Sequence, residues 1–235
     1  MRRFERFSPG AWDQTYVSQS GSCELRVVLT GAGRFAAQRA LAHAFDADPD
    51  ICIVSGLSGS LKASYAPGGV LTARRVADVM GTRMLCCDAE LVSRAEASGA
   101  KVVEKFLVSE QVVSTAEEKR ALSSSGDAVD MESLYILAAA AQRGIRSVAI
   151  RAISDGADSN LPLDFNGVFN ERGAVSIPKV IGQVVRKPGR IPGLFRLANE
   201  SELAATSLAR FLEAYIQGIE LGPLPEIAKA EALAV

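Results

Sequence analysis

The segment SVAIRAIS, residues 147–154, is apolar nearly throughout, which is typical of a strand covered on both faces. A shorter apolar run at residues 51–56, ICIVSG, predicts a second buried strand. Strands are also predicted over residues 24–30 (ELRVVLT), in the segment GGVLTARRVAD after Pro67, and within residues 101–109. Helical patterns follow two of these runs, one from GAG to about Phe45 and one over roughly residues 132–143, closed by Gly144. This alternation predicts a single α/β domain with a largely parallel sheet between helices.

The last third of the chain carries weaker signals. After Asp155 we expect a polar loop, then an irregular stretch rich in proline and glycine over residues 156–193. An amphipathic helix is predicted from about Glu200 to Gln217, and the tail 222–235 is expected to fray. The whole chain, residues 1–235, is predicted to form one domain.

Composition excludes several classes of function. The 235 residues carry a formal net charge of -1 and no polybasic run, which argues against steering toward nucleic acid or an anionic membrane. No stretch reaches the roughly 18 apolar residues of a membrane span, and the start lacks the apolar region of a signal peptide. We therefore expect a cytoplasmic protein. With four cysteines, no CxxC pair and a single histidine, His43, we expect no metal site.

Three of the predicted strands end in a segment of small and acidic residues. These segments are TGAGR (30–34), SGLSGS (55–60) and ISDGAD (153–158). Ligands of open α/β sheets bind at the carboxyl ends of the strands, so these segments are candidates for one site. Each glycine segment is equally well explained as a tight turn. Asp155 is either a carboxyl group whose pKa is raised by burial unless it is paired, which suits a general acid, or a turn-capping residue.

Two acids, Asp130 and Glu132, precede the helix predicted over residues 132–143. Acids are stabilised by the free N–H groups of a helix N-terminus, so capping explains one of them. A buried carboxylate can instead accept hydrogen bonds from two vicinal hydroxyls, as on a ribose. We interpret Asp130 as the cap and Glu132 as the ligand-binding residue.

The segments AVDMES (128–133) and SVAIRAISDGAD (147–158) resemble the signature of the nucleoside phosphorylase and nucleosidase superfamily. The nearest branch is that of the methylthioadenosine/adenosylhomocysteine nucleosidases. The resemblance extends upstream to VVLTGAGRFAAQRAL and SGLSGSLKASYAPGGVLTA, and covers about residues 22–165. It implies a single α/β domain with a mixed, mostly parallel and partly barrel-like sheet flanked by helices. It also implies a homo-oligomer, at least a dimer, in which a partner subunit often completes the pocket for the 5′ group.

The resemblance further implies a role for each matching residue. Glu132 would hold the ribose hydroxyls, and Met131 would pack against the sugar. Asp155 would protonate or hydrogen-bond the purine at N7, with Ser154 beside it. Two more residues would line the site, namely Gly59 near the sugar or the nucleophile and Phe165 near the 5′ substituent. No cofactor and no metal are implied.

The sequence departs from the family pattern at three points. The opening strand of the family, and the glutamate that activates water in the nucleosidases, have no counterpart here. Three explanations stay open: the start is clipped or misassigned, the general base has been lost, or Glu5 serves as the general base. The phosphate-binding hydroxyl residue of the phosphorylases is replaced by Leu57, although Ser58 follows, and a phosphate-assisting arginine is replaced by Val54. The aromatic residue that stacks on the base is replaced by Val113.

These features predict a hydrolase that releases adenine from a 5′-modified adenosine. Two alternatives stay open: a phosphate-dependent phosphorylase, and a catalytically silent nucleoside-binding member of the family. The segment PGRIPGLFRL, residues 188–197, resembles the branch linked to hopanoid synthesis, whose members act on nucleosides with long apolar 5′ groups. An ordinary loop and helix start that covers the sheet explains the same segment.

Overall fold

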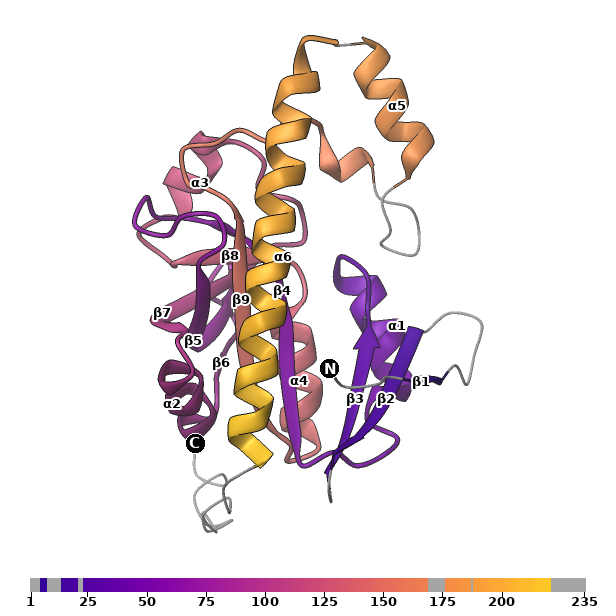
Figure 1. Cartoon of the computed structure of the whole chain (residues 1–235). Coiled ribbons are helices and arrows are strands. Elements are labelled where there is room, and N and C mark those ends of the chain that lie inside the picture. The colour runs from indigo at the N-terminus through magenta and orange to yellow at the C-terminus, as the bar shows by residue number, and fades with distance from the viewer. Residues whose placement is uncertain (1–4, 8–13, 21–22, 169–175, 187, 221–235) are drawn as a thin grey trace.

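Two β-sheets and the helices packed around them make up the molecule in the computed structural model (Figure 1). The structure describes residues 5–7, 14–20, 23–168, 176–186 and 188–220. The tail 222–235, predicted to fray, lies outside the described residues, as does the side chain of His43. That the chain forms one domain from end to end stays a prediction.

The larger sheet has six strands in the order β6-β5-β7-β8-β4-β9. The sheet is mixed: β7 runs parallel to both β5 and β8, and β4 runs parallel to β9, whereas β4 runs antiparallel to β8. The start of β5 also pairs with β9, so that five of the strands close into a ring. This confirms the predicted mixed, partly barrel-like sheet. Its strands are β4 (Ile51–Ser60), β5 (Val70–Asp78), β6 (Met84–Cys86), β7 (Lys101–Val108), β8 (Ala128–Asp130) and β9 (Arg146–Asp155).

Helices pack around the outside of this ring. The longest, α6, runs along β9 and β4, and its Tyr215 hydroxyl donates a hydrogen bond of 3.0 Å to Leu91 O of α2 (Figure 1). Another helix, α4, packs against β9 and β4 and also contacts α1. The helices are α1 (Arg34–Ala44), α2 (Ala89–Ala97), α3 (Ala116–Leu122), α4 (Ser133–Gln142), α5 (Ile177–Arg186) and α6 (Ile191–Glu220), with short 3-10 turns η1 (Phe165–Gly167) and η2 (Pro188–Arg190).

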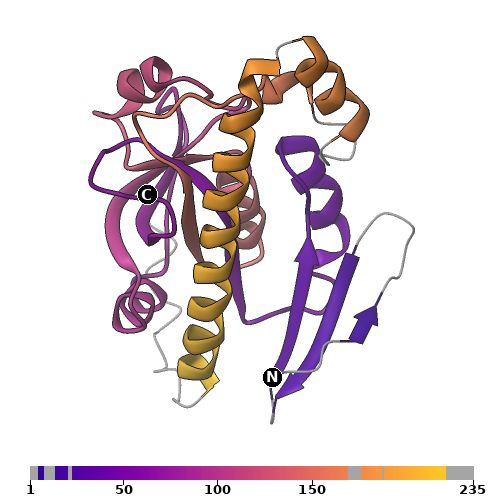
Figure 2. The same ribbon diagram turned by 45° about the horizontal axis from the view of Figure 1, so that its top comes forward.

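The smaller sheet is an antiparallel meander beside the ring (Figure 2). Its strands are β1 (Glu5–Phe7), β2 (Gln14–Ser20) and β3 (Cys23–Leu29), and β3 leads through the glycine turn into α1. The first two strands fall within residues 1–21, the start of the chain that is atypical for the family because it lacks a counterpart of the family's opening strand and glutamate. Glu5, the alternative general base, lies in β1, and its side chain is outside the described part of the structure.

The prediction of an irregular stretch over residues 156–193 is wrong in its second half. Residues 177–186 form α5, and α6 begins at Ile191, nine residues before the predicted Glu200. Pro178 and Pro192 misled the prediction, because each is the second residue of its helix. Proline is tolerated in the first turn of a helix, where its missing N–H has no intrahelical partner.

An ion pair joins the start of α2 to the start of β9. Asp88 is the N-cap of α2, and its Oδ1 accepts a hydrogen bond of 3.0 Å from Leu91 N. Both carboxylate oxygens also accept hydrogen bonds of 2.8 Å from the Arg146 guanidinium. The hydrogen bond from Arg146 is the main cause that holds the pKa of Asp88 below its usual value. The carboxylate therefore stabilises the folded state in its charged form.

We predict that Asp88→Ala lowers the free energy of unfolding by about 1–3 kcal/mol at neutral pH, because the cap and the ion pair are lost together. A lowered pKa contributes stability above the usual aspartate value of about 3.9, and this contribution disappears as the pH falls through the lowered value. The difference in free energy of unfolding between wild type and Asp88→Ala should therefore become smaller in acid. Urea denaturation at neutral pH and in acid measures this difference, and Asp50→Ala, at an exposed aspartate, is the control. An equal loss for both variants would contradict the assignment.

Candidate functional site

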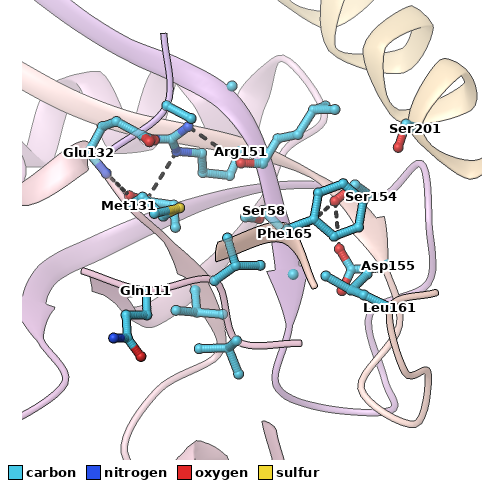
Figure 3. Close-up of a pocket in the computed structure, with 18 of the residues that line it drawn as sticks. Ser58, Gln111, Met131, Glu132, Arg151, Ser154, Asp155, Leu161, Phe165 and Ser201 are labelled. Atoms are coloured by element: carbon cyan, nitrogen blue, oxygen red, sulfur yellow. Dashed lines mark hydrogen bonds and ion pairs between the residues drawn. The ribbon is translucent and has the colours of Figure 1, made fainter. Parts of the chain in front are cut away.

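A cavity of about 460 Å³ opens where the strands of the ring end (Figure 3). Its size suits a small organic ligand. The three small-residue segments singled out in the sequence meet here, since Thr30–Ala32, Ser55–Gly59 and Ser154–Asp155 all line it. Seven residues that the family resemblance places in the site also line this cavity, namely Gly59, Val113, Met131, Glu132, Ser154, Asp155 and Phe165.

Asp130 caps α4, as predicted. Its Oδ1 accepts hydrogen bonds from the backbone N–H groups of Glu132 (2.8 Å) and Ser133 (2.9 Å). Its Oδ2 accepts a third hydrogen bond, of 2.6 Å, from the Ser133 hydroxyl. The two acids of the DMES motif are thus divided between a structural role for Asp130 and a cavity-lining position for Glu132.

Glu132 is held by the glycine turn on one side and by an arginine on the other. Its Oε1 accepts a hydrogen bond of 2.6 Å from Gly33 N, and its Oε2 lies 3.5 Å from Arg151 Nη2. Gly33 has a φ of +89°, a conformation that favours glycine and turns its N–H toward the carboxylate. Burial raises the pKa of Glu132, while the charge of Arg151 acts in the opposite sense. The carboxylate is therefore fixed in place but has free lone pairs for a ligand.

Arg151 is the charged residue inside the apolar strand β9, and it is buried. Its Nε lies 3.1 Å from Asp130 Oδ2, and its Nη2 donates a hydrogen bond of 2.8 Å to Ser133 Oγ. Figure 3 shows Arg151 beside Glu132 and Met131, with Ser154 and Asp155 on the other side of the cavity. The arginine therefore fixes the strand end that bears Asp155 to the start of α4 that bears Glu132.

Asp155 ends β9, and it is paired. One carboxylate oxygen accepts a hydrogen bond of 2.7 Å from Ser154 Oγ, and the other forms an ion pair with Lys119 Nζ. Lys119 is fully buried in α3, and its ammonium also donates to Gly156 O (2.8 Å) and Ser159 O (3.1 Å). The three donors of the ammonium are thus satisfied, which a buried charge requires.

Two small residues in β4 shape the floor of the cavity. A Cβ placed on Gly59 would lie 3.1 Å from Asp155 Oδ2, so a larger residue would crowd this carboxylate. Ser58 is buried, and its Oγ has no hydrogen-bond partner within the described part of the chain. Val54, where one branch of the family has an arginine, is buried in the core and does not line the cavity.

Part of the apolar wall comes from residues that follow β9. Phe165 in η1, Leu161 before it and Leu197 in α6 line the cavity, as does Ser201 one turn further along α6. The sequence identified Phe165 alone among these, because α6 was predicted to start after Leu197. The acids that line the cavity within the described ranges are Asp130, Glu132 and Asp155.

Two charged residues of the site escaped the sequence analysis. A lone arginine in a strand covered on both faces was a usable signal for Arg151, because such a charge must find buried partners. Lys119 gave no signal, since AEEKRAL reads as an exposed helix with a capping box formed by Thr115 and Glu118.

Neither a metal cluster nor a membrane-spanning helix is found among the described residues. No group of three or more histidine, cysteine or acidic side chains there could hold a metal ion. None of the helices in the same ranges is long and apolar enough to cross a bilayer.

The family model of the phosphorylase superfamily matches residues 3–186 of the chain. The chain belongs to the phosphorylase superfamily. Comparison with curated proteins gives no significant match for this superfamily member.

Solved structures of the same fold come from several bacterial enzymes. A mutant of the Helicobacter pylori methylthioadenosine nucleosidase, with 5′-methylthioadenosine in its active site, is 17% identical with a TM-score of 0.70, and the match covers 92% of this chain and 89% of that one. The H. pylori futalosine hydrolase is also 17% identical with a TM-score of 0.70, over 92% and 88% of the two chains. The Neisseria meningitidis nucleosidase is 19% identical with a TM-score of 0.68, over 92% and 90%. At these low identities, the similarity establishes only that this chain shares the fold of the three enzymes.

We predict that Lys119→Met destabilises this phosphorylase-superfamily chain by about 3–5 kcal/mol, because it leaves the Asp155 carboxylate buried without its cation. The double variant Lys119→Met/Asp155→Asn should recover part of this loss. Urea denaturation of the two single variants and the double variant measures the coupling.

The half-buried Lys105→Met in β7 serves as the control for this cycle. Additive effects of the two single substitutions would show that the ion pair contributes nothing to folding.

Proposed function

We propose that the chain is a purine nucleoside N-ribosyl hydrolase that releases adenine from a 5′-modified adenosine. The observation that carries the proposal is that Glu132 and Asp155, from different elements, line one cavity of nucleoside size. The shared fold with a nucleosidase that holds 5′-methylthioadenosine supports a nucleoside as the substrate.

In this proposal Glu132 binds the sugar. Its carboxylate accepts hydrogen bonds from the ribose hydroxyls, and its negative charge stabilises the oxocarbenium-like sugar that forms as the glycosidic bond breaks. Gly33 N and Arg151 keep the carboxylate in one orientation, so little reorganisation is needed during the reaction. Met131 packs against the sugar.

Asp155 serves the leaving base. The bond between C1′ and the purine nitrogen breaks, its electron pair stays on the base, and a proton reaches N7 through Asp155. Water adds to C1′ and releases one proton to the solvent. Asp155 is a carboxylate in its ion pair with Lys119, so the proton comes from the Lys119 ammonium and passes through this carboxylate to N7. Solvent returns a proton to Lys119 after the products leave. Ser154 holds the other oxygen of Asp155 and so fixes the direction of transfer.

The apolar wall accounts for the proposed 5′ group. Leu161, Phe165 and Leu197 present no charged group to the cavity, and they lie on the segments that close it. Val113 replaces an aromatic residue that would stack on the base, so we propose that the base is recognised mainly by its edge, through Asp155.

We predict that Asp155→Asn and Glu132→Ala each lower kcat for adenine release by about 10²–10⁴-fold, the usual effect of losing an acid group that acts in the transition state. A base-release assay with a series of 5′-modified adenosines measures the effect. Asp158→Asn, an exposed acid in the loop after β9, is the matched control and should keep full activity.

Unchanged base release in either site variant would contradict the proposed roles. Calorimetry on the wild type adds a second test. Binding of an adenine nucleoside without release of its base would identify a silent nucleoside-binding member instead.

The second candidate function is phosphorolysis, and one observation favours it. Ser58 Oγ is buried at the cavity and has no partner in the described residues, so a bound anion could accept its hydrogen bond. Phosphate would then attack C1′ in place of water and yield ribose 1-phosphate. The absence of a hydroxyl residue at Leu57 weakens this candidate.

We predict that base release proceeds at the same rate with and without phosphate, and that Ser58→Ala changes kcat by less than about tenfold, because water needs no anion-binding hydroxyl. Assays in phosphate-free buffer, with Ser60→Ala in the same strand as the control, provide the measurement. Release that requires phosphate and is lost in Ser58→Ala would show that the enzyme is a phosphorylase.

A further inference from the structure

Helix α5 leaves an apolar stripe in solvent. Ile177, Ile181 and Val185 follow one another at intervals of four residues and therefore lie on one face of the helix. Their exposed fractions are 63%, 56% and 74%. Large apolar side chains in such a row are costly to leave in water, so the stripe indicates a surface that contacts something apolar.

The stripe lies in the most basic part of the chain. From Ile177 to Asn199 the sequence contains no aspartate or glutamate. The same segment contains five basic residues, namely Lys179, Arg186, Lys187, Arg190 and Arg196. The net charge of -1 for the whole chain conceals this local excess, because acids elsewhere balance it. A charged polar face beside an apolar face is the pattern of helices that lie in a membrane interface.

The apolar surface continues past α5. Ile191 and Phe195, in the first turns of α6, are 40% and 68% exposed. Figures 1 and 2 both show α5 and the start of α6 at one end of the molecule, away from the six-stranded sheet. Leu197 and Ser201, on the same stretch of α6, line the cavity. The basic and apolar end is therefore next to the cavity of the candidate site.

We propose that α5 and the first turns of α6 dock onto a lipid bilayer that contains anionic lipids. The apolar stripe would enter the boundary between head groups and acyl chains, and the basic side chains would contact the negative head groups. Two copies of the chain that met through this face would bring their basic segments together, and like charges would oppose that contact. Charge complementarity therefore favours an anionic lipid surface as the occupant.

The contact is weak and reversible. Helix α5 has only ten residues, and each basic residue near an anionic surface adds little on its own. The sequence argument against steering toward an anionic membrane relied on the net charge and on the lack of a contiguous basic run. Neither quantity detects basic residues that are spread along one helix and its continuation. The docking surface is independent of the proposed nucleosidase activity, because vesicle binding needs no substrate.

Flotation with lipid vesicles tests the proposal on the full chain. We expect the protein to float with vesicles of phosphatidylcholine and phosphatidylglycerol, to remain behind with phosphatidylcholine alone, and to be released as the salt concentration rises. Ile181→Ser/Val185→Ser should lower the partition coefficient about tenfold or more, since two exposed apolar side chains of the stripe are lost. Arg186→Gln/Arg196→Gln should lower it as well.

The matched control is Met80→Ser/Met84→Ser, which removes two exposed apolar side chains, 81% and 52% exposed, at the β5–β6 turn. It should bind vesicles as the wild type does. No binding to anionic vesicles would overturn the proposal, and so would equal binding to both kinds of vesicle. A concentration-dependent dimer that the stripe variant dissociates, with no vesicle binding, would assign the surface to a second copy and also overturn it.

Discussion

The buried guanidinium of Arg151 is the contact on which the candidate site depends. It reaches from the middle of β9 to Asp130 and Ser133 at the start of α4 and to the carboxylate of Glu132. A single buried cation therefore connects the strand that ends in Asp155 with the helix start that presents Glu132. Because a buried charge without partners is so costly, the three elements that bear these groups, β9, β8 and α4, can pack only in the arrangement that satisfies it.

The carboxylates of Glu132 and Asp155 in the candidate site are stabilised in different ways. Glu132 is surrounded by one backbone N–H and one shared arginine, so burial dominates and its pKa rises. Asp155 has a lysine of its own, together with the Ser154 hydroxyl. In the proposed mechanism this difference separates their tasks, because one carboxylate stabilises positive charge on the sugar and the other exchanges a proton with the base.

Much of the fold and of the site was predictable from the sequence. The apolar strands, the glycine turns and the DMES and ISD motifs are local signals, and they predicted the sheet and seven of the residues that line the cavity. Lys119 was not predictable, because its partner lies 36 residues away and its own helix looks exposed. The helix α5 was missed because its local signals misled the prediction. Pro178 and Gly182 both argue against a helix, yet α5 accommodates both residues.

The pairing of β5 with both β7 and β9 has a consequence for how the molecule opens. In a ring of strands, no strand that borders the cavity can separate without breaking hydrogen bonds on two sides. Local fluctuations of β9 are therefore coupled to those of β5, and the two should exchange their backbone amide hydrogens as one cooperative unit. The meander β1–β3 is outside this ring and can loosen independently, which would leave the Asp155 side of the cavity intact while the Gly33 side moves.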